Sequence, residues 1–387
     1  MQCGIGQSHA RTIALMAPGK DIKGAKEIMD IESTTCREIC DKAVLDKDPL
    51  VSAAMITYNH APYIADAIEG ILQQETNFPF ELVIGEDCST DGTREIVLNY
   101  QKKYPDIIKI ITSDKNVGSC KNTVRTERAC RGKYIAYCEG DDYWHHPLKL
   151  QKQIDFLETH PDYGLVHSDI KRYNVTTGQT TESSNRYLKR QKHISDNGDP
   201  NLVFKILIRT YGIATCTVCV RKKLLDCVIE SDPVAFQSDR FVADDIPRWI
   251  ELSRLTKLKF MDGEPLVTYR LLPESLTRSR NIRKRMKYIL SGFEMTLYYA
   301  DKYGCTDKLP KSRLDHYTYP LLSYAYCYRD TELAAKVKAM RTHLPFGQRL
   351  LYWASVHHVA RLLLWPLVWP LVNVKRVIGK FADILRQ

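Results

Sequence analysis

The chain has 387 residues, of which 44% are hydrophobic and 26% are charged. This composition excludes a mostly disordered protein and supplies enough apolar material for the cores of two or three domains. The net charge of +10 is unevenly placed, because residues 278–387 contain 20 Lys or Arg and 7 Asp or Glu, while residues 1–277 carry a net charge of −3. A basic C-terminal third suits nucleic acid, anionic lipid or an acidic partner, and charge alone does not choose between them.

The cysteines and the apolar runs of the sequence indicate the cellular compartment of the protein. Twelve cysteines are too few for a disulfide scaffold, and no further ligands at zinc spacing follow Cys216 and Cys219. We therefore expect reduced, buried thiols and a cytoplasmic protein. The N-terminus lacks the apolar run of a signal peptide. Residues 362–374 form the longest charge-free apolar run near the C-terminus, and they fall short of the roughly 20 residues that span a membrane.

The chain after residue 50 alternates between two hydrophobic patterns, whereas residues 1–48 show no clear period. Apolar runs of strand length are expected at 51–57, 80–84, 107–111, 134–138 and 165–170. Amphipathic helical patterns separate them at 61–74, 91–100, 123–130 and 147–159. This alternation predicts right-handed crossovers and an α/β fold with a doubly wound, mainly parallel sheet.

The second half of the chain changes character twice. Residues 171–200 are polar and predict a mobile loop or lid. Strand-like or apolar segments then resume the fold at 202–208, 214–220 and 265–270. Four helices are expected after residue 280, at 281–303, 310–328, 331–340 and 347–379.

Polar clusters follow three of the predicted strands, at the edge where parallel sheets bind ligands. The first strand ends in Thr57, Tyr58 and Asn59, and the second is followed by Glu-Asp-Cys-Ser-Thr-Asp-Gly-Thr at 86–93. The fourth is followed by Glu-Gly-Asp-Asp-Tyr-Trp at 139–144. A turn and helix start explain the end of the second cluster, but not its leading acidic pair.

The third cluster places Glu139, Asp141 and Asp142 within four residues of one another. Packed together, these carboxylates would raise one another's pKa unless a cation relieved the repulsion. Oxygen ligands suit Mn²⁺ or Mg²⁺, which keep positions open for substrate phosphates. A solvated acidic turn is the alternative, and the strand context together with the other two clusters favours the metal.

These clusters, with Asn116-Val-Gly118 and the run from Gly132 to Trp144, resemble family 2 glycosyltransferases. The resemblance covers residues 50–169 and extends more loosely to about residue 275. It implies a GT-A fold with a Rossmann-like nucleotide-binding half. It also implies inverting transfer of a sugar from a nucleoside diphosphate, with UDP the expected nucleotide, in cell-surface polysaccharide synthesis. The expected acceptor is a glycan or a lipid-linked saccharide.

The resemblance also implies roles for individual residues. Asp87 corresponds to the acid that hydrogen-bonds the base of the donor, and Tyr58 to the aromatic residue beside that base. Glu139 and Asp141 correspond to the Asp-x-Asp motif, with Glu in place of the first Asp. The expected metal ligands are Asp141, Asp142 and Glu139. Arg270 closes the segment 265–270, where it could meet the diphosphate or pair with a surface carboxylate. The full donor-binding set is Thr57, Tyr58, Asn59, Asp87, Asn116, Gly118, Glu139 and Arg270.

Inversion by direct displacement needs a general base for the acceptor hydroxyl. Family members carry this base as an acid that opens a helix after the lid and precedes a Trp. Asp244-Asp245-Ile-Pro-Arg-Trp249 fits this description, with Asp245 as the first choice and Asp244 as the reserve. The alternative is an ordinary helix start before the proline.

The predicted domains are an N-terminal extension (1–48), a catalytic domain (49–275), a helical region (276–345) and an amphipathic tail (346–387). Trp353, Trp365 and Trp369 with flanking cations predict peripheral attachment of the tail to the cytoplasmic face of a membrane. A core or oligomer-contact helix is the alternative. No arginine-rich stripe with interleaved aromatics supports nucleic acid as a partner. A non-catalytic module that binds a nucleotide sugar or glycan is the alternative function.

Overall fold

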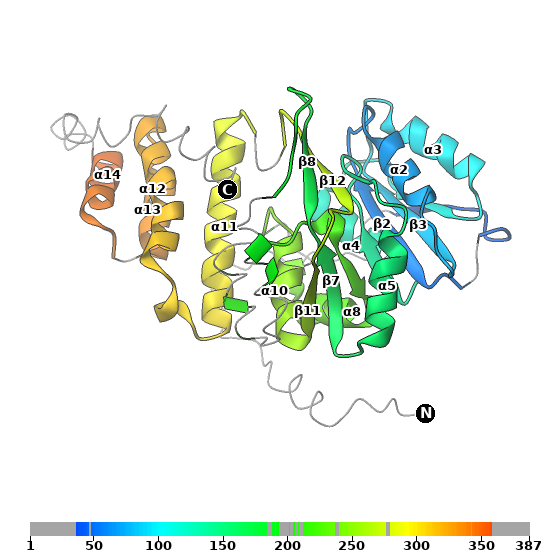
Figure 1. The fold of residues 1–387 in the computed structure, drawn as a ribbon. Coiled ribbons are helices and arrows are strands. Elements are labelled where there is room, and N and C mark those ends of the chain that lie inside the picture. Colours follow the sequence, from blue (N-terminus) through cyan, green and yellow to red (C-terminus); the bar gives the residue numbers. More distant parts are fainter. Residues whose placement is uncertain are drawn as a thin grey trace.

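A computed structural model describes residues 36–45, 48–183, 212–236, 240–275, 279–341 and 343–357, with isolated positions between 188 and 208. Strands and helices alternate in the first part of the chain, and the described residues after 281 contain helices and no strand (Figure 1). The part of the predicted tail beyond residue 357 lies outside the described residues.

The central sheet has eight strands in the order β1-β4-β3-β2-β5-β10-β7-β11. Their bounds are β1 (Arg37–Ile39), β2 (Val51–Thr57), β3 (Phe80–Glu86), β4 (Ile108–Thr112), β5 (Tyr134–Tyr137), β7 (Tyr163–Ser168), β10 (Cys219–Arg221) and β11 (Lys257–Met261). Six strands run in one direction, and β1 and β10 run against them. The predicted α/β fold with a mainly parallel sheet is confirmed.

The winding direction of the sheet reverses beside β2. The chain passes from β2 to β3 and β4 on one side, and β5 then pairs with the other side of β2. In such sheets the crevice at the reversal, beyond the carboxyl ends of the strands, is where ligands bind. The polar clusters after β2, β3 and β5 all follow strands at this point.

A second sheet contains four strands in the order β6-β12-β8-β9. They are β6 (Tyr143–Trp144), β12 (Val267–Leu271), β8 (Ile170–Asn174) and β9 (Thr180–Thr181). The expectation of a loop from residue 171 is therefore wrong for residues 171–174 and 180–181. The reason is pairing with a distant segment, because β8 lies parallel to β12 and antiparallel to β9.

The strand expected at 214–220 is also only partly correct. Thr215–Thr217 form a 3₁₀ turn, η2, and β10 begins at Cys219. Trp144 Nε1 donates to the Cys216 carbonyl over 3.0 Å, which directs this carbonyl away from a strand ladder. Cys216 and Cys219 are buried free thiols, as expected.

Two hydrophobic clusters cover the two faces of the central sheet. Successive strand residues point to opposite faces, so Met55 packs with α2 and α5, whereas Ala54 belongs to the cluster that contains α8 and α10. The helices connecting the strands are α2 (Ile64–Leu72), α3 (Thr93–Lys103), α4 (Ser119–Ala129), α5 (Lys149–Thr159), α8 (Lys222–Ser231), α9 (Pro233–Phe236) and α10 (Asp245–Leu255).

The expected C-terminal helical region is confirmed. It contains α11 (Ile282–Lys302), η3 (Thr306–Lys308), α12 (Lys311–Tyr328), α13 (Thr331–Met340) and α14 (Phe346–Val356). Helix α11 joins the two parts, because Tyr299 packs in the sheet's cluster and Phe293 in the cluster of α12–α14. Helices α12–α14 lie on the side of α11 away from the sheet (Figure 1).

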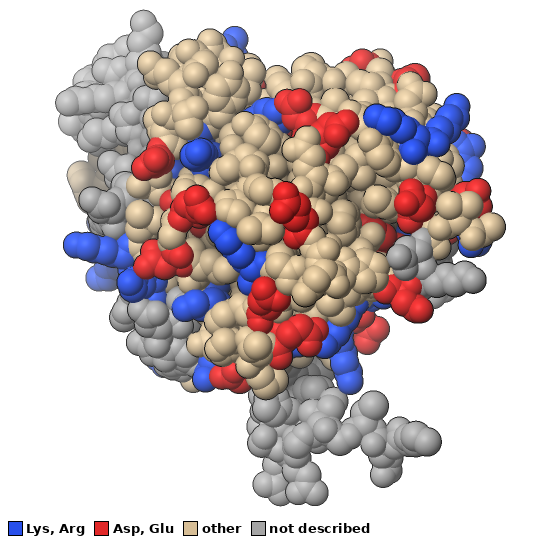
Figure 2. All heavy atoms as spheres, turned by 45° about the vertical axis from the view of Figure 1, so that its right-hand side comes forward, with Lys and Arg blue, Asp and Glu red and all other residues tan. Residues whose placement is uncertain are grey.

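No helix in the described ranges is long and apolar enough to cross a membrane. On the face of the molecule drawn in Figure 2, Lys and Arg side chains are interspersed with Asp and Glu over the whole surface. The charges of this face are mixed instead of being gathered in one stripe.

Candidate active site

The loops after β2 and β3 are joined by hydrogen bonds. Asn59 has a φ of 57°, a left-handed conformation that Asn tolerates better than most residues. Its backbone N–H donates to Ser89 Oγ over 3.0 Å, and its Oδ1 accepts the Thr90 N–H over 2.9 Å. Tyr58, between Asn59 and the end of β2, is 44% exposed. The two predicted clusters thus form one edge with an accessible aromatic ring.

Asp87 is the centre of a hydrogen-bonded unit at this edge. Its Oδ1 accepts the Val117 N–H over 2.8 Å and its Oδ2 accepts the Gly118 N–H over 3.0 Å. Asn116 Nδ2 donates to the Asp87 carbonyl over 3.0 Å. Burial raises the pKa of Asp87, against the two N–H donors and the nearby Arg125 guanidinium. The structure therefore brings Asp87, Asn116 and Gly118 together from separate motifs.

Glu86 has a different role from its neighbour. Its carboxylate accepts the Ser89 N–H over 2.6 Å, Arg94 Nε over 2.6 Å and the Thr112 hydroxyl over 2.9 Å. Burial opposes ionisation, but these donors prevail and lower the pKa of Glu86. Asp91 caps the first turn of α3 with its carboxylate, as the turn interpretation of this segment expects. Both carboxylates anchor the loop that holds Asp87.

The loop after β5 is pressed against the end of β2. The Gly140 N–H donates to the Ile56 carbonyl over 3.0 Å, and a Cβ on Gly140 would lie 2.7 Å from Thr57 Oγ1. Only glycine permits this approach. The result is that Glu139 and Asp142 lie at the same edge as the Asp87 unit.

The carboxylates of this loop lack the donors that the β3 loop provides. Glu139 Oε2 is buried and has no hydrogen-bond partner within the part of the chain that the structure describes. Burial and the charge of Asp141, with smaller contributions from Asp245 and Asp244, raise the pKa of Glu139 to about 8. Burial, Asp141 and Glu139 also raise the pKa of Asp142 well above its usual range, although its Oδ1 accepts the Arg270 N–H over 2.8 Å.

This donor set fits a hard divalent cation. Ligand atoms of Glu139, Asp142 and Cys216 lie within 4.8 Å of one another, and the half-buried Asp141 belongs to the same loop. Burial keeps the pKa of the Cys216 thiol well above its usual value, and a hard divalent ion prefers the carboxylate oxygens of this set to a thiol. An orphaned carboxylate oxygen among repelling neighbours is what an oxygen-preferring ion such as Mn²⁺ or Mg²⁺ relieves.

The two candidate bases stand at the start of α10 and differ in their partners. Asp245 accepts the Thr215 hydroxyl over 2.6 Å and the Ile246 N–H over 2.9 Å. Burial and the neighbouring Asp244 charge raise the pKa of Asp245. Asp244 instead lies 3.7 Å from the Arg248 guanidinium and makes no side-chain capping bond within the described ranges. A carboxylate with a raised pKa is better suited to take up a proton near neutral pH.

Arg270 sits beside the acidic loop and also pairs with a carboxylate. Its guanidinium donates to the Asp141 carbonyl over 3.2 Å and forms an ion pair with Asp66. The guanidinium lies 4.4 Å from the centre of the Tyr143 ring. Pairing with a carboxylate, one of the two environments considered for Arg270 from the sequence, is therefore present, and contact with the diphosphate stays a prediction.

A buried polar side of α4 was missed by the sequence reasoning. Asn122, Arg125, Thr126 and Glu127 are all buried against the sheet. Arg125 donates to the Glu86 carbonyl over 3.0 Å. The sequence contained one signal, because this helix connects two parallel strands but has no apolar stripe. A helix that packs on a parallel sheet has to bury one side, so a helix without an apolar stripe buries polar residues.

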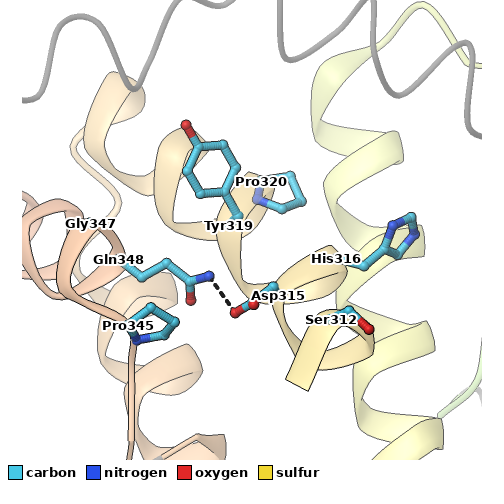
Figure 3. Close-up of a pocket in the computed structure, with 8 residues that line it drawn as sticks. All are labelled: Ser312, Asp315, His316, Tyr319, Pro320, Pro345, Gly347 and Gln348. Carbon is cyan, nitrogen blue, oxygen red and sulfur yellow. Dashed lines mark hydrogen bonds between the residues drawn. The ribbon is translucent and has the colours of Figure 1, made fainter. Parts of the chain in front are cut away.

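A cavity of about 520 Å³ lies elsewhere, in the helical region between α12 and the start of α14 (Figure 3). Its wall includes Asp315, which accepts Gln348 Nε2 over 2.8 Å and Arg341 Nη1 over 2.7 Å. None of the predicted site residues lines it. Its lining residues are Ser312, Asp315, His316, Tyr319, Pro320, Pro345, Gly347 and Gln348.

The segment that carries the strand-end clusters matches the family model for glycosyl transferase family 2 from residue 52 to residue 226. Residues 52–226 belong to glycosyl transferase family 2. An uncharacterized protein of Mycobacterium tuberculosis (strain H37Rv) is 43% identical over 121 residues, which are 31% of this chain and 35% of that protein. The chondroitin synthase of Escherichia coli is 36% identical to this chain over 107 residues, 28% of this chain and 15% of that enzyme.

The region similar to this family 2 domain thus spans about a third of the mycobacterial relative, and less of the E. coli enzyme. The structural alignment with S. aureus TarS in complex with UDP-GlcNAc covers 86% of this chain and 90% of the TarS chain. The TM-score is 0.48, and the two sequences are 18% identical.

Proposed function

We propose that the chain is an inverting, metal-dependent glycosyltransferase. It moves a sugar from a nucleoside diphosphate donor, with UDP as the nucleotide, to a glycan or lipid-linked saccharide in cell-surface polysaccharide synthesis. The observation that carries the proposal is the buried Glu139 oxygen without a hydrogen-bond partner among the described residues, in a loop that also holds Asp141 and Asp142 and stands at the same sheet edge as the Asp87 unit. The family 2 domain supports the same reaction class.

The donor base is bound between Tyr58 and Asp87 in this proposal. The exposed Tyr58 ring offers a stacking surface, as aromatic side chains do for nucleic acid bases. Asp87 Oδ1 accepts the Val117 N–H and also lies 3.5 Å from Arg125, whereas Oδ2 accepts the Gly118 N–H and keeps a second lone pair for a uracil N–H. Asn59, Thr57, Asn116 and Gly118 hold these two residues in place.

Asp141, with Glu139 and Asp142, would hold Mn²⁺ or Mg²⁺. The ion would supply positive charge to the leaving diphosphate when bound. Arg270 adds a second cation beside Asp141, and its bond to the Asp141 carbonyl fixes the loop.

Asp245 is the base. It takes the proton of the acceptor hydroxyl as that oxygen forms a bond to the anomeric carbon, while the bond from this carbon to the diphosphate oxygen breaks on the opposite side. This displacement inverts the anomeric configuration. Asp244 is the reserve choice because its carboxylate faces the Arg248 guanidinium at 3.7 Å, and taking up a proton would weaken this ion pair.

We further propose that residues 346–387 attach the protein to the cytoplasmic face of an anionic membrane, beside a catalytic domain at 49–275 and a helical region at 276–345. Phe346 and Trp353 of α14 are 68% and 54% exposed. The Arg349 guanidinium lies 5.9 Å from the centre of the Phe346 ring, and the His357 ring packs at a tilt against Trp353, with ring centres 4.7 Å apart. Exposed aromatic rings flanked by cations favour the headgroup region.

The test uses the purified full-length chain and a panel of nucleotide sugars with saccharide and lipid-linked acceptors. Released nucleoside diphosphate is measured with Mn²⁺ and with a chelator, and we expect one donor to dominate in a metal-dependent reaction. Asp245→Asn should reduce turnover by about 10² to 10⁴-fold, the usual share of general base catalysis, and leave UDP binding intact.

The matched control is Asp226→Asn, which removes a surface carboxylate paired with Lys222 on α8 and should leave turnover unchanged. Normal turnover in Asp245→Asn would reject this residue as the base. UDP binding without diphosphate release from any donor would favour the non-catalytic binding module instead.

A further inference from the structure

A buried ion pair joins helix α4 to helix α10. Arg248 Nε donates to Glu127 Oε1 over 2.8 Å, and Arg248 Nη2 donates to Glu127 Oε2 over 2.9 Å. Both side chains are 1% exposed. Tyr137 Oη donates to the same carboxylate over 2.6 Å, so the pair also contacts β5. The two residues are 121 positions apart in the sequence.

Each end of this pair reaches one half of the candidate active site. On α4, Arg125 stands two residues before Glu127 and lies 3.5 Å from Asp87 Oδ1. On α10, Arg248 Nη1 donates to the Asp244 carbonyl, one residue before Asp245. Helix α4 therefore links the Asp87 unit to the start of α10, through the Arg125–Asp87 contact at one end and the Glu127–Arg248 pair at the other.

The chemistry of the pair favours orientation over stability. A buried ion pair is often no more stabilising than apolar side chains of the same volume, because both charges lose their hydration. A two-pronged arginine–carboxylate contact does, however, fix the plane and direction of both groups. Asp244 makes no capping bond of its own among the described residues, so Arg248 is the guanidinium that holds the first turn of α10.

We propose that Glu127 and Arg248 are positioning residues that hold the start of α10, and with it Asp245, at a fixed place relative to Asp87. This inference rests on the proposed function in one respect, the assignment of Asp245 as the base. Neither Glu127 nor Arg248 touches the reacting atoms. They act by fixing the position of the Asp245 carboxylate relative to the bound acceptor hydroxyl.

The first experiment needs no substrate. Hydrogen exchange is followed at the backbone amides of segment 246–249 (Ile246, Arg248 and Trp249, since Pro247 has no N–H) in the full-length chain and in Arg248→Lys. This variant keeps the charge but loses the two-pronged contact. We expect exchange there to become about tenfold faster, as for a locally loosened helix end, while exchange in α8 stays unchanged. Glu127→Gln should have the same effect, and it serves as the second variant if Arg248→Lys folds poorly.

The second experiment measures kcat and KM with the donor found in the nucleotide-sugar panel. Arg248→Lys should lower kcat by about 10 to 100-fold, with the KM for the donor within about threefold, because misplacing a catalytic group affects the reaction more than donor binding. UDP binding with Mn²⁺ should be unchanged within the same limit. A merely structural role would lower the amount of folded protein and leave kcat per folded molecule unaltered.

The matched control is Arg131→Lys. Arg131 also contacts a buried glutamate with two guanidinium nitrogens, at 2.9 and 2.7 Å from Glu81 Oε2, but at the opposite edge of the sheet. This control should change neither exchange at 246–249 nor kcat.

Unchanged exchange at α10 in both variants, or faster exchange with an unchanged kcat, overturns the positioning role. An equal loss of kcat in Arg131→Lys overturns it as well. Because exchange is measured without substrate, its result is separate from a failure to find a donor or a failure of the base assignment.

Discussion

The carboxylates after β3 and those after β5 stand at the same edge of one sheet, yet their surroundings are opposite. Glu86 and Asp91 have complete sets of N–H and O–H donors, and these donors lower the pKa of both groups against the effect of burial. Glu139 has a buried oxygen with no donor among the described residues, and burial with mutual repulsion raises the pKa of Glu139 and of Asp142. A satisfied carboxylate builds a loop, whereas an unsatisfied one is prepared for a ligand.

Asp87 combines both properties. It has the donors of a structural carboxylate, yet burial still raises its pKa. Under the proposed function, Glu86 therefore supports the loop, Glu139 contacts the ligand, and Asp87 does both.

The largest effect should come from the acidic loop itself. Asp141→Asn removes the charge expected to hold the metal, and turnover should fall about 10³-fold or more, as when charge stabilisation at a reacting centre is lost. The measurement is diphosphate release at saturating donor and Mn²⁺. Turnover within a few-fold of the unaltered chain would remove Asp141 from the site.

The pH dependence of the free energy of unfolding should differ between the two groups of carboxylates. Glu139 has a pKa of about 8 in the folded chain and near 4.5 when unfolded, so between these values the unfolded state binds fewer protons. The free energy of unfolding should therefore fall as the pH rises through this window, by an amount on the order of a few kcal/mol.

This pH dependence is measured by urea unfolding in the presence of a chelator. Glu139→Gln should flatten the curve, and adding Mn²⁺ to the unaltered chain should raise its stability at the alkaline end. An identical pH curve in Glu139→Gln would show that this carboxylate is not under-satisfied.

Glu86 should show the opposite sign. Because its pKa is lowered in the folded chain, its ionised form contributes stability above the pKa of the unfolded state, and this contribution is lost as the pH falls through the folded value. Glu86→Gln should cost about 1–3 kcal/mol of unfolding free energy near pH 7, the usual cost of leaving buried donors unpaired. Thermal and urea unfolding give the value. A change in turnover with no loss of stability would place Glu86 in the ligand group instead.

The smallest effect concerns the basic end of the molecule. Replacing Phe346 and Trp353 with Ser should reduce partition of the full-length chain onto anionic vesicles about tenfold, because both rings are exposed and amphipathic anchors depend on such rings. Sedimentation with phosphatidylserine-containing vesicles measures the partition. Equal partition of the double variant and the unaltered chain would contradict attachment through α14.

The parts of the fold that follow from local pattern were predictable from the sequence. Strands β2 to β5 are short apolar runs, each bounded by polar residues, and their order brings Tyr58, Asp87 and Glu139 to one edge as expected. The Asp87 contacts with Asn116 and Gly118 confirm that the separate motifs belong together. The identity of the base came from family resemblance and stays a prediction.

The parts that depend on distant partners were not predictable. The 3₁₀ turn at Cys216 reflects a bond from Trp144, and β8 is a strand because β12 pairs with it. The buried side of α4 is polar because Glu127 meets Arg248, a pairing with no local pattern. Such contacts become visible only when the chain is folded.

The central claim is that the strand-end carboxylates bind a nucleotide and its metal, and the most direct test is a crystal structure of the full-length chain with UDP and Mn²⁺. The anomalous scattering of manganese locates the ion without ambiguity. The account predicts the manganese peak at Asp141 and Glu139, with the uracil between Tyr58 and Asp87. Nucleotide bound in the cavity between α12 and α14, or a metal peak away from the β5 loop, would contradict it.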